Sequence, residues 1–223
     1  MFSEQQIIDS WMKNVSPWIR AVREGEITSR TQVTNLAIIE AVIDCRPESV
    51  LDVGCGEGWL VRELEALDIS AQGIDAVSAL IAAAREAGQG SFQELAYEQI
   101  FADAFAEKFD LLVCNFSLLG DESVVHLFQQ APGLLNPAGW FIVQSLHPRV
   151  VCAEADYRDG WREGSWQGFN AEFREPAPWY FRTIESWQAL FEQNGFEPAL
   201  TTEPLDPLSQ APASIIFSAR LRP

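Results

Sequence analysis

The stretch S-V-L-D-V-G-C-G-E-G-W-L, residues 49–60, decides the fold of this chain. It begins with a short apolar run, 50–53, whose length suits a buried strand. Three glycines at alternate positions follow, and apolar residues then recur at helical spacing up to residue 67. A strand, a glycine turn and a helix in this order present backbone N–H groups and a helix N-terminus to a ligand. The stretch therefore predicts an α/β fold with a ligand site at the turn.

The spacing of the glycines narrows the choice of ligand. A dinucleotide fingerprint, G-x-G-x-x-G, would need a glycine at position 59, where the chain has Trp59. A phosphate-binding P-loop would need Gly-Lys-Ser/Thr at the end of the turn, and neither Lys nor Ser/Thr is there. The pattern present is D-x-G-x-G-x-G, which runs from Asp52 to Gly58. It resembles the first motif of the class I S-adenosylmethionine-dependent methyltransferases, and an ordinary glycine-rich turn is the alternative interpretation.

The resemblance implies a role for each residue of this motif. In the family, the loop wraps the methionine part of the cofactor, and the acidic residue that ends the strand, here Asp52, lies beneath it. The implied loop contacts are Gly54, Cys55, Gly56, Gly58 and Trp59.

A second acidic residue follows at the end of the next predicted strand, 69–75. The strand ends in G-I-D, and an acid at this place in a nucleotide-binding α/β fold accepts hydrogen bonds from ribose hydroxyls. The resemblance implies this role for Asp75, with Ala76 beside it. The alternative for Asp75 is to cap the helix that follows.

Other cofactor contacts are implied outside the two motifs. An arginine beside the helix before the first strand often meets the methionine carboxylate in this family, and Arg30 is the candidate, with a solvated surface arginine as the alternative. Around the adenine, Ala96 and Tyr97 stand where many relatives have an acid. A buried strand begins at Phe109, and the residues at its end would lie beside the transferable methyl group. These residues are Asn115, Phe116 and Ser117.

The fold implied by the resemblance is a three-layer αβα sandwich. Its seven-stranded sheet would be mostly parallel, with an antiparallel last strand. The chain would form a single domain, 1–223, made of an N-terminal helical cover (1–46), a cofactor-binding half (47–148), an aromatic-rich insertion or lid (149–182), and a closing helix with strands (183–223). A helix is predicted over 31–45, with Leu36 and Ile43 among the residues that face inward.

Candidate catalytic residues come from the end of the fifth predicted strand and from the insertion. Ligands of open α/β sheets lie at the carboxyl ends of the strands, so His147 is placed where a general base would be needed. A loop histidine that packs or only contacts substrate is the alternative. Tyr157 and the carboxylates of the insertion, such as Glu154 and Asp156, come next. An acceptor that is already nucleophilic would need no base.

The insertion is dense in aromatic residues, which must be buried against something. A lid over a substrate pocket is one explanation, and the interface of a homodimer is the other. As pocket walls, aromatic rings interleaved with carboxylates would suit an aromatic or amine-bearing acceptor.

Charge and composition limit the partners. The formal net charge of −17 argues against nucleic-acid binding and favours neutral or cationic small molecules. Four scattered cysteines and two histidines predict no metal site. The first residues lack a basic region followed by an apolar stretch, and no apolar run is long enough to span a membrane, so a cytoplasmic protein without membrane contact is expected.

The function that follows from the resemblance is transfer of a methyl group from S-adenosylmethionine to a small-molecule acceptor, without a metal. S-adenosylhomocysteine would be the product of the cofactor. Two alternatives stay open: a non-catalytic protein that binds S-adenosylmethionine or a nucleotide on the same fold, and an NAD(P)-dependent oxidoreductase, which Trp59 in place of a glycine disfavours.

Overall fold

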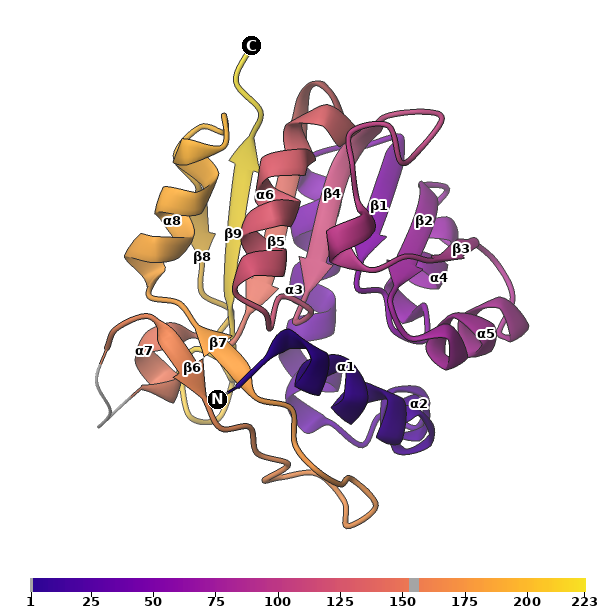
Figure 1. Ribbon diagram of the computed structural model, residues 1–223, viewed down its shortest axis with the longest axis vertical. Helices are drawn as coiled ribbons and strands as arrows, with labels where there is room; N and C mark the ends of the chain where they lie inside the picture. Colours follow the sequence, from indigo (N-terminus) through magenta and orange to yellow (C-terminus); the bar gives the residue numbers. More distant parts are fainter. Residues whose placement is uncertain (1, 153–156) are drawn as a thin grey trace.

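A seven-stranded sheet forms the middle of the protein (Figure 1). The computed structural model describes residues 2–152 and 157–223, so the predicted carboxylates Glu154 and Asp156 lie outside the described residues. The strand order is β3-β2-β1-β4-β5-β9-β8. The strands are β1 (Ser49–Val53), β2 (Ser70–Asp75), β3 (Ser91–Glu94), β4 (Phe109–Asn115), β5 (Leu135–Ser145), β8 (Leu200–Thr202) and β9 (Ile215–Arg220).

The strand directions confirm the predicted sheet. Neighbours among β1 to β5 pair in parallel, whereas β9 pairs antiparallel with both β5 and β8. Only β9 is therefore reversed among these strands. The chain builds β2 and β3 on one side of β1 and then returns to place β4 on the other side. Ligands of open α/β sheets bind at such a switch point, at the carboxyl ends of the strands.

Helices cover both faces of the sheet, which confirms the three-layer fold. One face carries α3 (Asn35–Asp44), α4 (Trp59–Glu65) and α5 (Ser78–Glu86), and the other carries α6 (Glu122–Leu134) and α8 (Ile184–Gln193). Parallel strands covered on both sides are apolar at consecutive positions. In β1, Val50 packs into the first cluster of helices and Leu51 into the second, and both are fully buried.

The helix before β1 differs from its prediction in phase. It begins with a π-helical turn, η1 (Arg30–Thr34), and continues as α3. Leu36 and Ile43, predicted to face inward, are 59% and 42% exposed, and Ile38 and Val42 are buried instead. A π-helical turn holds more residues than an α-helical turn, and it therefore rotates the face that α3 presents to the sheet.

The segment Asn136-Pro137-Ala138-Gly139 forms a bulge within β5, since Phe109 pairs with Leu135 and Leu111 pairs with Trp140. Several residues of β5 thus face one residue of β4. A bulge of this kind adds residues to one strand without ending the pairing.

Two segments far apart in the sequence lie together across the carboxyl edge of the parallel strands (Figure 1). The first is the helix pair α1 (Glu4–Lys13) and α2 (Val15–Arg23). The second is the insertion, which contains α7 (Pro148–Val151) and a small two-stranded sheet of β6 (Gly160–Arg162) and β7 (Trp179–Phe181).

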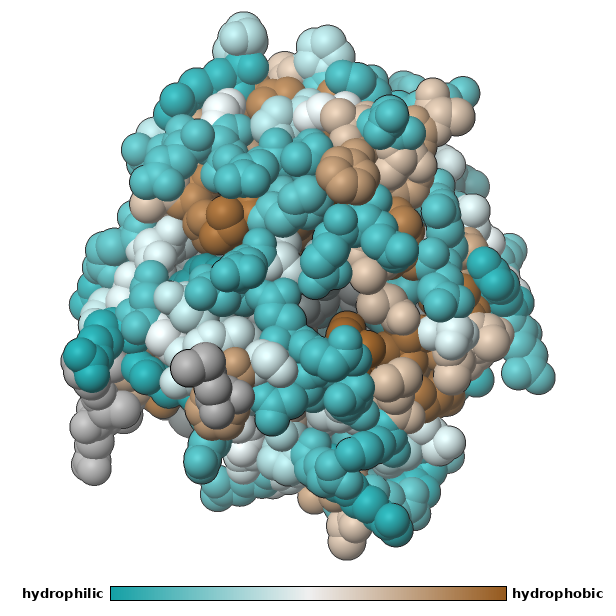
Figure 2. Space-filling model, in the orientation of Figure 1, coloured by the Kyte–Doolittle hydropathy of each residue, from teal (hydrophilic) through white to brown (hydrophobic). Residues whose placement is uncertain are grey.

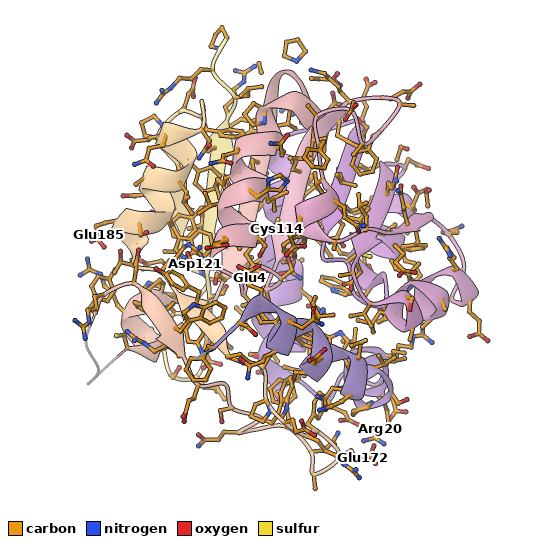
Figure 3. The ribbon with its side chains drawn as sticks, viewed as in Figure 1. Glu4, Arg20, Cys114, Asp121, Glu172 and Glu185 are labelled. Atoms are coloured by element: carbon orange, nitrogen blue, oxygen red, sulfur yellow. The ribbon has the colours of Figure 1, made fainter. Side chains whose placement is uncertain are left out.

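Polar contacts join α1 and α2 to the insertion. The amide of Asn14 is buried; it donates to the carbonyl of Arg174 at 2.8 Å and accepts from the Arg174 N–H at 2.9 Å. At the outer end of α2, Arg20 and Glu172 form an ion pair with an N–O distance of 2.9 Å (Figure 3). The two segments therefore form one layer over the sheet edge. Of the helices in the described part of the chain, none is long and apolar enough to cross a membrane.

Candidate active site

Two adjoining cavities lie between this layer and the sheet edge. The first, of about 130 Å³, is bounded by the glycine loop, α1 and the ends of β2 and β4. The second, of about 330 Å³, is bounded by α2, the insertion and the ends of β4 and β5. The residues that line both are Trp11, Trp18, Arg30, Phe116 and Leu119. Figure 2 shows the surface hollowed above α1, with hydrophobic residues along the rim.

The glycine loop leaves room for a ligand at two of its three glycines. Gly54, Gly56 and Gly58 all have positive φ, between 58° and 82°. Gly54 and Gly56 line the first cavity. Gly58 does not: a Cβ there would lie 2.6 Å from the ring of Phe92, so this glycine allows close packing against β3. The structure thus separates Gly58 from the predicted cofactor contacts.

Asp75 lies at the end of β2 with its carboxylate in the first cavity. One oxygen accepts the Gly56 N–H and the other accepts the Val77 N–H, each at 2.9 Å. Burial raises the pKa of this carboxyl, and the backbone N–H donors oppose that rise. The carboxylate therefore holds the glycine loop against the start of α5. Both interpretations of Asp75 from the sequence are compatible with this place.

Asp52 lies beneath the loop and lines neither cavity. Its carboxyl is buried, and one oxygen has no hydrogen-bond partner among the described residues. Burial, and next the negative charge of Asp75, raise its pKa to about 8. Asp52 is thus placed under the cavity and not in its wall.

Arg30 stands in the wall between the two cavities. Its residue is 8% exposed, and its guanidinium lies over the rings of Trp59 and Trp18, with 4.9 and 5.4 Å between the carbon and the ring centroids. Nε donates to Asn35 at 3.2 Å, whereas Nη2 is buried without a partner in the described part of the protein. Burial lowers the pKa of the guanidinium to about 10. A buried cation with a free donor calls for an anionic partner.

The remaining predicted contacts also line the first cavity: Cys55, Trp59, Ala76, Ala96, Tyr97, Asn115, Phe116 and Ser117. The Tyr97 hydroxyl, placed over Gly54, donates to the Ser117 carbonyl at 3.2 Å. Phe116 has a left-handed backbone, with φ of 54°, at the boundary between the cavities. Strained backbone of this kind concentrates at functional sites because the surrounding structure must hold it in place.

Ion pairs to a buried carboxylate fix α2 over the glycine loop. The carboxylate of Glu57, inside the loop, is fully buried and accepts from Arg23 of α2 at 2.7 Å and from Arg62 of α4 at 2.7 Å. On the other side, Glu4 of α1 accepts the backbone N–H groups of Asp121 and Ser123 at the start of α6 (Figure 3). These contacts therefore fix the position of α1 and α2 over the glycine loop.

His147 is not brought to either cavity. Its neighbours Leu146 and Pro148 line the second cavity, but the imidazole is 6% exposed and its Nε2 lies 3.1 Å from Oε1 of Glu203. The chain turns into α7 at this residue, which directs the ring toward the segment between β8 and β9. The role of general base predicted for His147 is therefore not supported by its position.

Tyr157 also lies outside both cavities. Its hydroxyl accepts the Ile184 N–H at 2.9 Å and donates to Glu185 at 3.0 Å, at the start of α8. The phenol thus caps a helix in this structure, and the catalytic role of Tyr157 stays a prediction that its position does not support.

Comparison with protein families shows to which family the chain belongs. A family model described as a methyltransferase domain matches residues 30–200. The chain belongs to this family. The matched range holds the glycine loop, Asp75, the sheet up to β8 and the whole insertion.

Relatives of this methyltransferase-domain protein are distant. The ubiquinone biosynthesis O-methyltransferase of Albidiferax ferrireducens is 29% identical over 131 residues, which are 56% of this chain and 52% of that protein. The chain spans about half the length of the curated relatives it matches.

Solved structures share the fold. A putative S-adenosylmethionine-dependent methyltransferase from Listeria monocytogenes has a TM-score of 0.63 at 18% identity, over 78% of this chain and 91% of that one. Magnesium protoporphyrin IX methyltransferase from Synechocystis, solved with bound S-adenosylmethionine, has a TM-score of 0.57 at 17% identity, over 92% and 83% of the two chains. The predicted family, the fold class and, at the level of the family, the cofactor S-adenosylmethionine are confirmed.

Several lining residues of this methyltransferase-domain protein were not singled out from the sequence. Trp11 and Trp18 read as the apolar face of packing helices, and their contact with both cavities follows only from where α1 and α2 dock. Thr34 and Arg182 line the second cavity. A threonine inside a helix and an arginine beside aromatic residues are too common to carry a functional signal by themselves.

Proposed function

We propose that this methyltransferase binds S-adenosylmethionine in the first cavity and transfers its methyl group to a small molecule in the second. The unpartnered guanidinium of Arg30, in the wall between the two cavities, is the observation that carries the proposal. It supplies a buried cation for a carboxylate at the point where a methionine-like group would meet an acceptor. Relatives named as O-methyltransferases of ubiquinone biosynthesis support a small-molecule acceptor.

The residues of the first cavity fit the parts of this cofactor. Gly54 and Gly56 let the backbone approach the ligand, the Asp75 carboxylate suits ribose hydroxyls, and Arg30 suits the methionine carboxylate. When bound, S-adenosylmethionine supplies a methyl group activated by a positively charged sulfur. The protein's own task is to hold donor and acceptor in line and to exclude water.

Phe116 and Trp18 belong to both cavities, so they form the boundary across which the acceptor meets the methyl group. The first cavity is smaller than the roughly 300–1,000 Å³ of typical ligand pockets. We therefore expect α1 and α2 to shift outward when the cofactor binds. The contacts of Asn14 with the insertion and of Arg23 with Glu57 would then re-form and hold α1 and α2 over the bound cofactor.

Replacement of Asp75 by alanine tests the cofactor site. We expect the affinity for S-adenosylhomocysteine to fall by about 10- to 150-fold, because hydrogen bonds to a charged group contribute about 1.5–3 kcal/mol. Glu94→Ala is the matched control, since Glu94 pairs with Asp75 across β2 and β3 but does not line the cavity. Calorimetric titration gives both affinities. A folded Asp75→Ala protein with unchanged affinity would remove the ribose role.

The alternative of a binding protein without catalysis makes a different prediction. In that case S-adenosylmethionine would bind, yet no labelled methyl group would reach any acceptor. An NAD(P)-dependent oxidoreductase is not favoured, because the matched family is one of methyltransferases.

A further inference from the structure

The charged groups of the two cavities differ in sign. Glu4, Asp75 and Glu98 line the first cavity, and Arg30 is its cation. The second cavity is lined by Arg30 and Arg182, and no Asp, Glu or His is among its described lining residues. The cavity built for the acceptor therefore offers positive charge and no side chain that is a usual proton acceptor.

Arg182 is held rigidly in this wall. Its guanidinium donates to the carbonyls of Gly120 at 2.7 Å and Asp121 at 2.9 Å, and it lies 4.7 Å from the centroid of the Tyr180 ring. Its ion pair with Asp121 has a distance of 3.1 Å, but the Asp121 side chain is 35% exposed and does not line the cavity. Once a cofactor carboxylate has paired with Arg30, Arg182 remains as the cation of the second cavity.

Thr34 adds a free hydrogen-bond donor to the same cavity. It is buried at the end of the π-helical turn that carries Arg30, and its hydroxyl has no partner within the described ranges 2–152 and 157–223. An unpaired buried hydroxyl that lines a cavity is suited to a polar atom of a ligand.

The other polar residues of this cavity do not supply a base. Burial raises the pKa of the Tyr180 phenol, so at neutral pH this group is protonated. The hydroxyls of Ser29, Thr34, Ser145 and Ser165 are not proton acceptors of useful strength near neutral pH. His147 and Tyr157 line neither cavity.

The walls of the cavity are aromatic. Trp166, Trp179 and Phe181 of the insertion and Trp18 of α2 surround a volume of about 330 Å³. A volume and an aromatic lining of this kind fit a flat apolar molecule of one or two rings.

We propose that the acceptor is a flat, apolar molecule that carries an anionic oxygen, as a carboxylate or an acidic phenolate does, and that it reacts without a base from the described residues of the cavity wall. The inference rests on the proposed function. A lone pair of the anionic oxygen forms the new O–CH₃ bond while the CH₃–S bond breaks and leaves its electron pair on sulfur. The acceptor loses its negative charge, the sulfonium loses its positive charge, and no proton moves.

The proposed acceptor differs in charge from the one expected from the sequence. A net charge of −17 favours neutral or cationic molecules, and the aromatic rings and carboxylates of the insertion favour an aromatic or amine-bearing acceptor. Net charge describes the whole surface, whereas the acceptor meets only the groups in the cavity wall. Among the described lining residues, the charged groups are Arg30, which pairs with the cofactor carboxylate, and Arg182, which remains for the acceptor.

Matched naphthalene probes test the inference. Quenching of tryptophan fluorescence, measured with saturating S-adenosylhomocysteine, compares naphthoate, naphthamide and naphthylmethylamine on the full chain. We expect naphthoate to bind at least about tenfold more tightly than the other two, as one charge-assisted hydrogen bond would provide. Amide or amine binding as tight as naphthoate would overturn the inference. Product analysis with naphthoate and with nitrophenolate then separates a carboxylate from a phenolate acceptor.

Two variants locate the recognition. Thr34→Val keeps shape and removes only an unpartnered hydroxyl, so it should fold; we expect about tenfold weaker naphthoate binding and unchanged S-adenosylhomocysteine binding. Arg182→Met should abolish the preference for the acid, and Arg182→Lys should restore part of it. Full retention of naphthoate affinity in both Thr34→Val and Arg182→Met would contradict the inference. Failure of S-adenosylhomocysteine itself to bind would instead overturn the proposed function, and the inference with it.

Discussion

Gly54→Ala is expected to lower kcat/KM for methyl transfer by at least about 100-fold, because a displacement of about 1 Å in a positioning element has an effect of this size. A Cβ at Gly54 would lie 2.4 Å from Cβ of Ser117 and 2.5 Å from the Tyr97 hydroxyl. Tyr97 begins η2 (Tyr97–Gln99) and packs against the core, and Ser117 follows the end of β4 and donates to the Val53 carbonyl at 2.6 Å, so the two cannot both retreat. The loop that faces the first cavity must therefore move.

Gly88→Ala is the matched control. Gly88 also has a positive φ, of 106°, but an added Cβ would have no atom within 4 Å among the described residues. Both variants carry backbone strain of about 1–3 kcal/mol, because L side chains rarely adopt these positive φ values. Only Gly54→Ala adds overpacking, of about 1–3 kcal/mol. Chemical denaturation and steady-state kinetics of the pair separate these effects. Equal losses of activity in the two variants would show that strain alone, and not the cradle at Gly54, is responsible.

Arg30→Met is expected to weaken S-adenosylhomocysteine binding by at least about 100-fold, since a buried carboxylate left without its partner costs about 3–5 kcal/mol. Methionine keeps much of the apolar contact with Trp18 and Trp59 but removes the charge and the free Nη2 donor. Arg222→Met, at an exposed position near the C-terminus, should leave the affinity unchanged. Calorimetric titration measures all three proteins.

The thermal stability of Arg30→Met distinguishes a role of Arg30 in ligand binding from a role in the fold. In the ligand-free protein, Arg30 is a buried cation with an unpaired donor and a pKa lowered to about 10. Its removal should leave the melting temperature unchanged or raise it. A large drop in melting temperature would show that Arg30 holds the fold, and the loss of affinity would then carry no information on the carboxylate.

The central sheet and the cofactor loop could be predicted because local sequence determines them. The apolar run of β1, the three glycines and the G-I-D end of β2 each constrain the backbone by themselves. Twelve of the fourteen predicted cofactor contacts line the first cavity, and the two exceptions, Asp52 and Gly58, lie directly beneath or behind the loop.

The acceptor side could not be predicted in the same way, because long-range docking builds it. Asn14 and Arg174 are far apart in the sequence, and their contact brings the insertion over α1 and α2. The direction of the His147 ring depends on Glu203, which the distant segment between β8 and β9 supplies. The π-helical turn that places Arg30 and Thr34 has no clear sequence signature. For the same reason, the prediction of which face of α3 points inward was wrong.

Titration of the purified protein with S-adenosylhomocysteine, and separately with NADH, tests the central claim most directly. We predict saturable binding of S-adenosylhomocysteine at one site per chain, no binding of NADH, and loss of the signal in Gly54→Ala but not in Gly88→Ala. Absence of S-adenosylhomocysteine binding, or binding of NADH in its place, would contradict the account. The glycine loop would then be a structural turn of the fold.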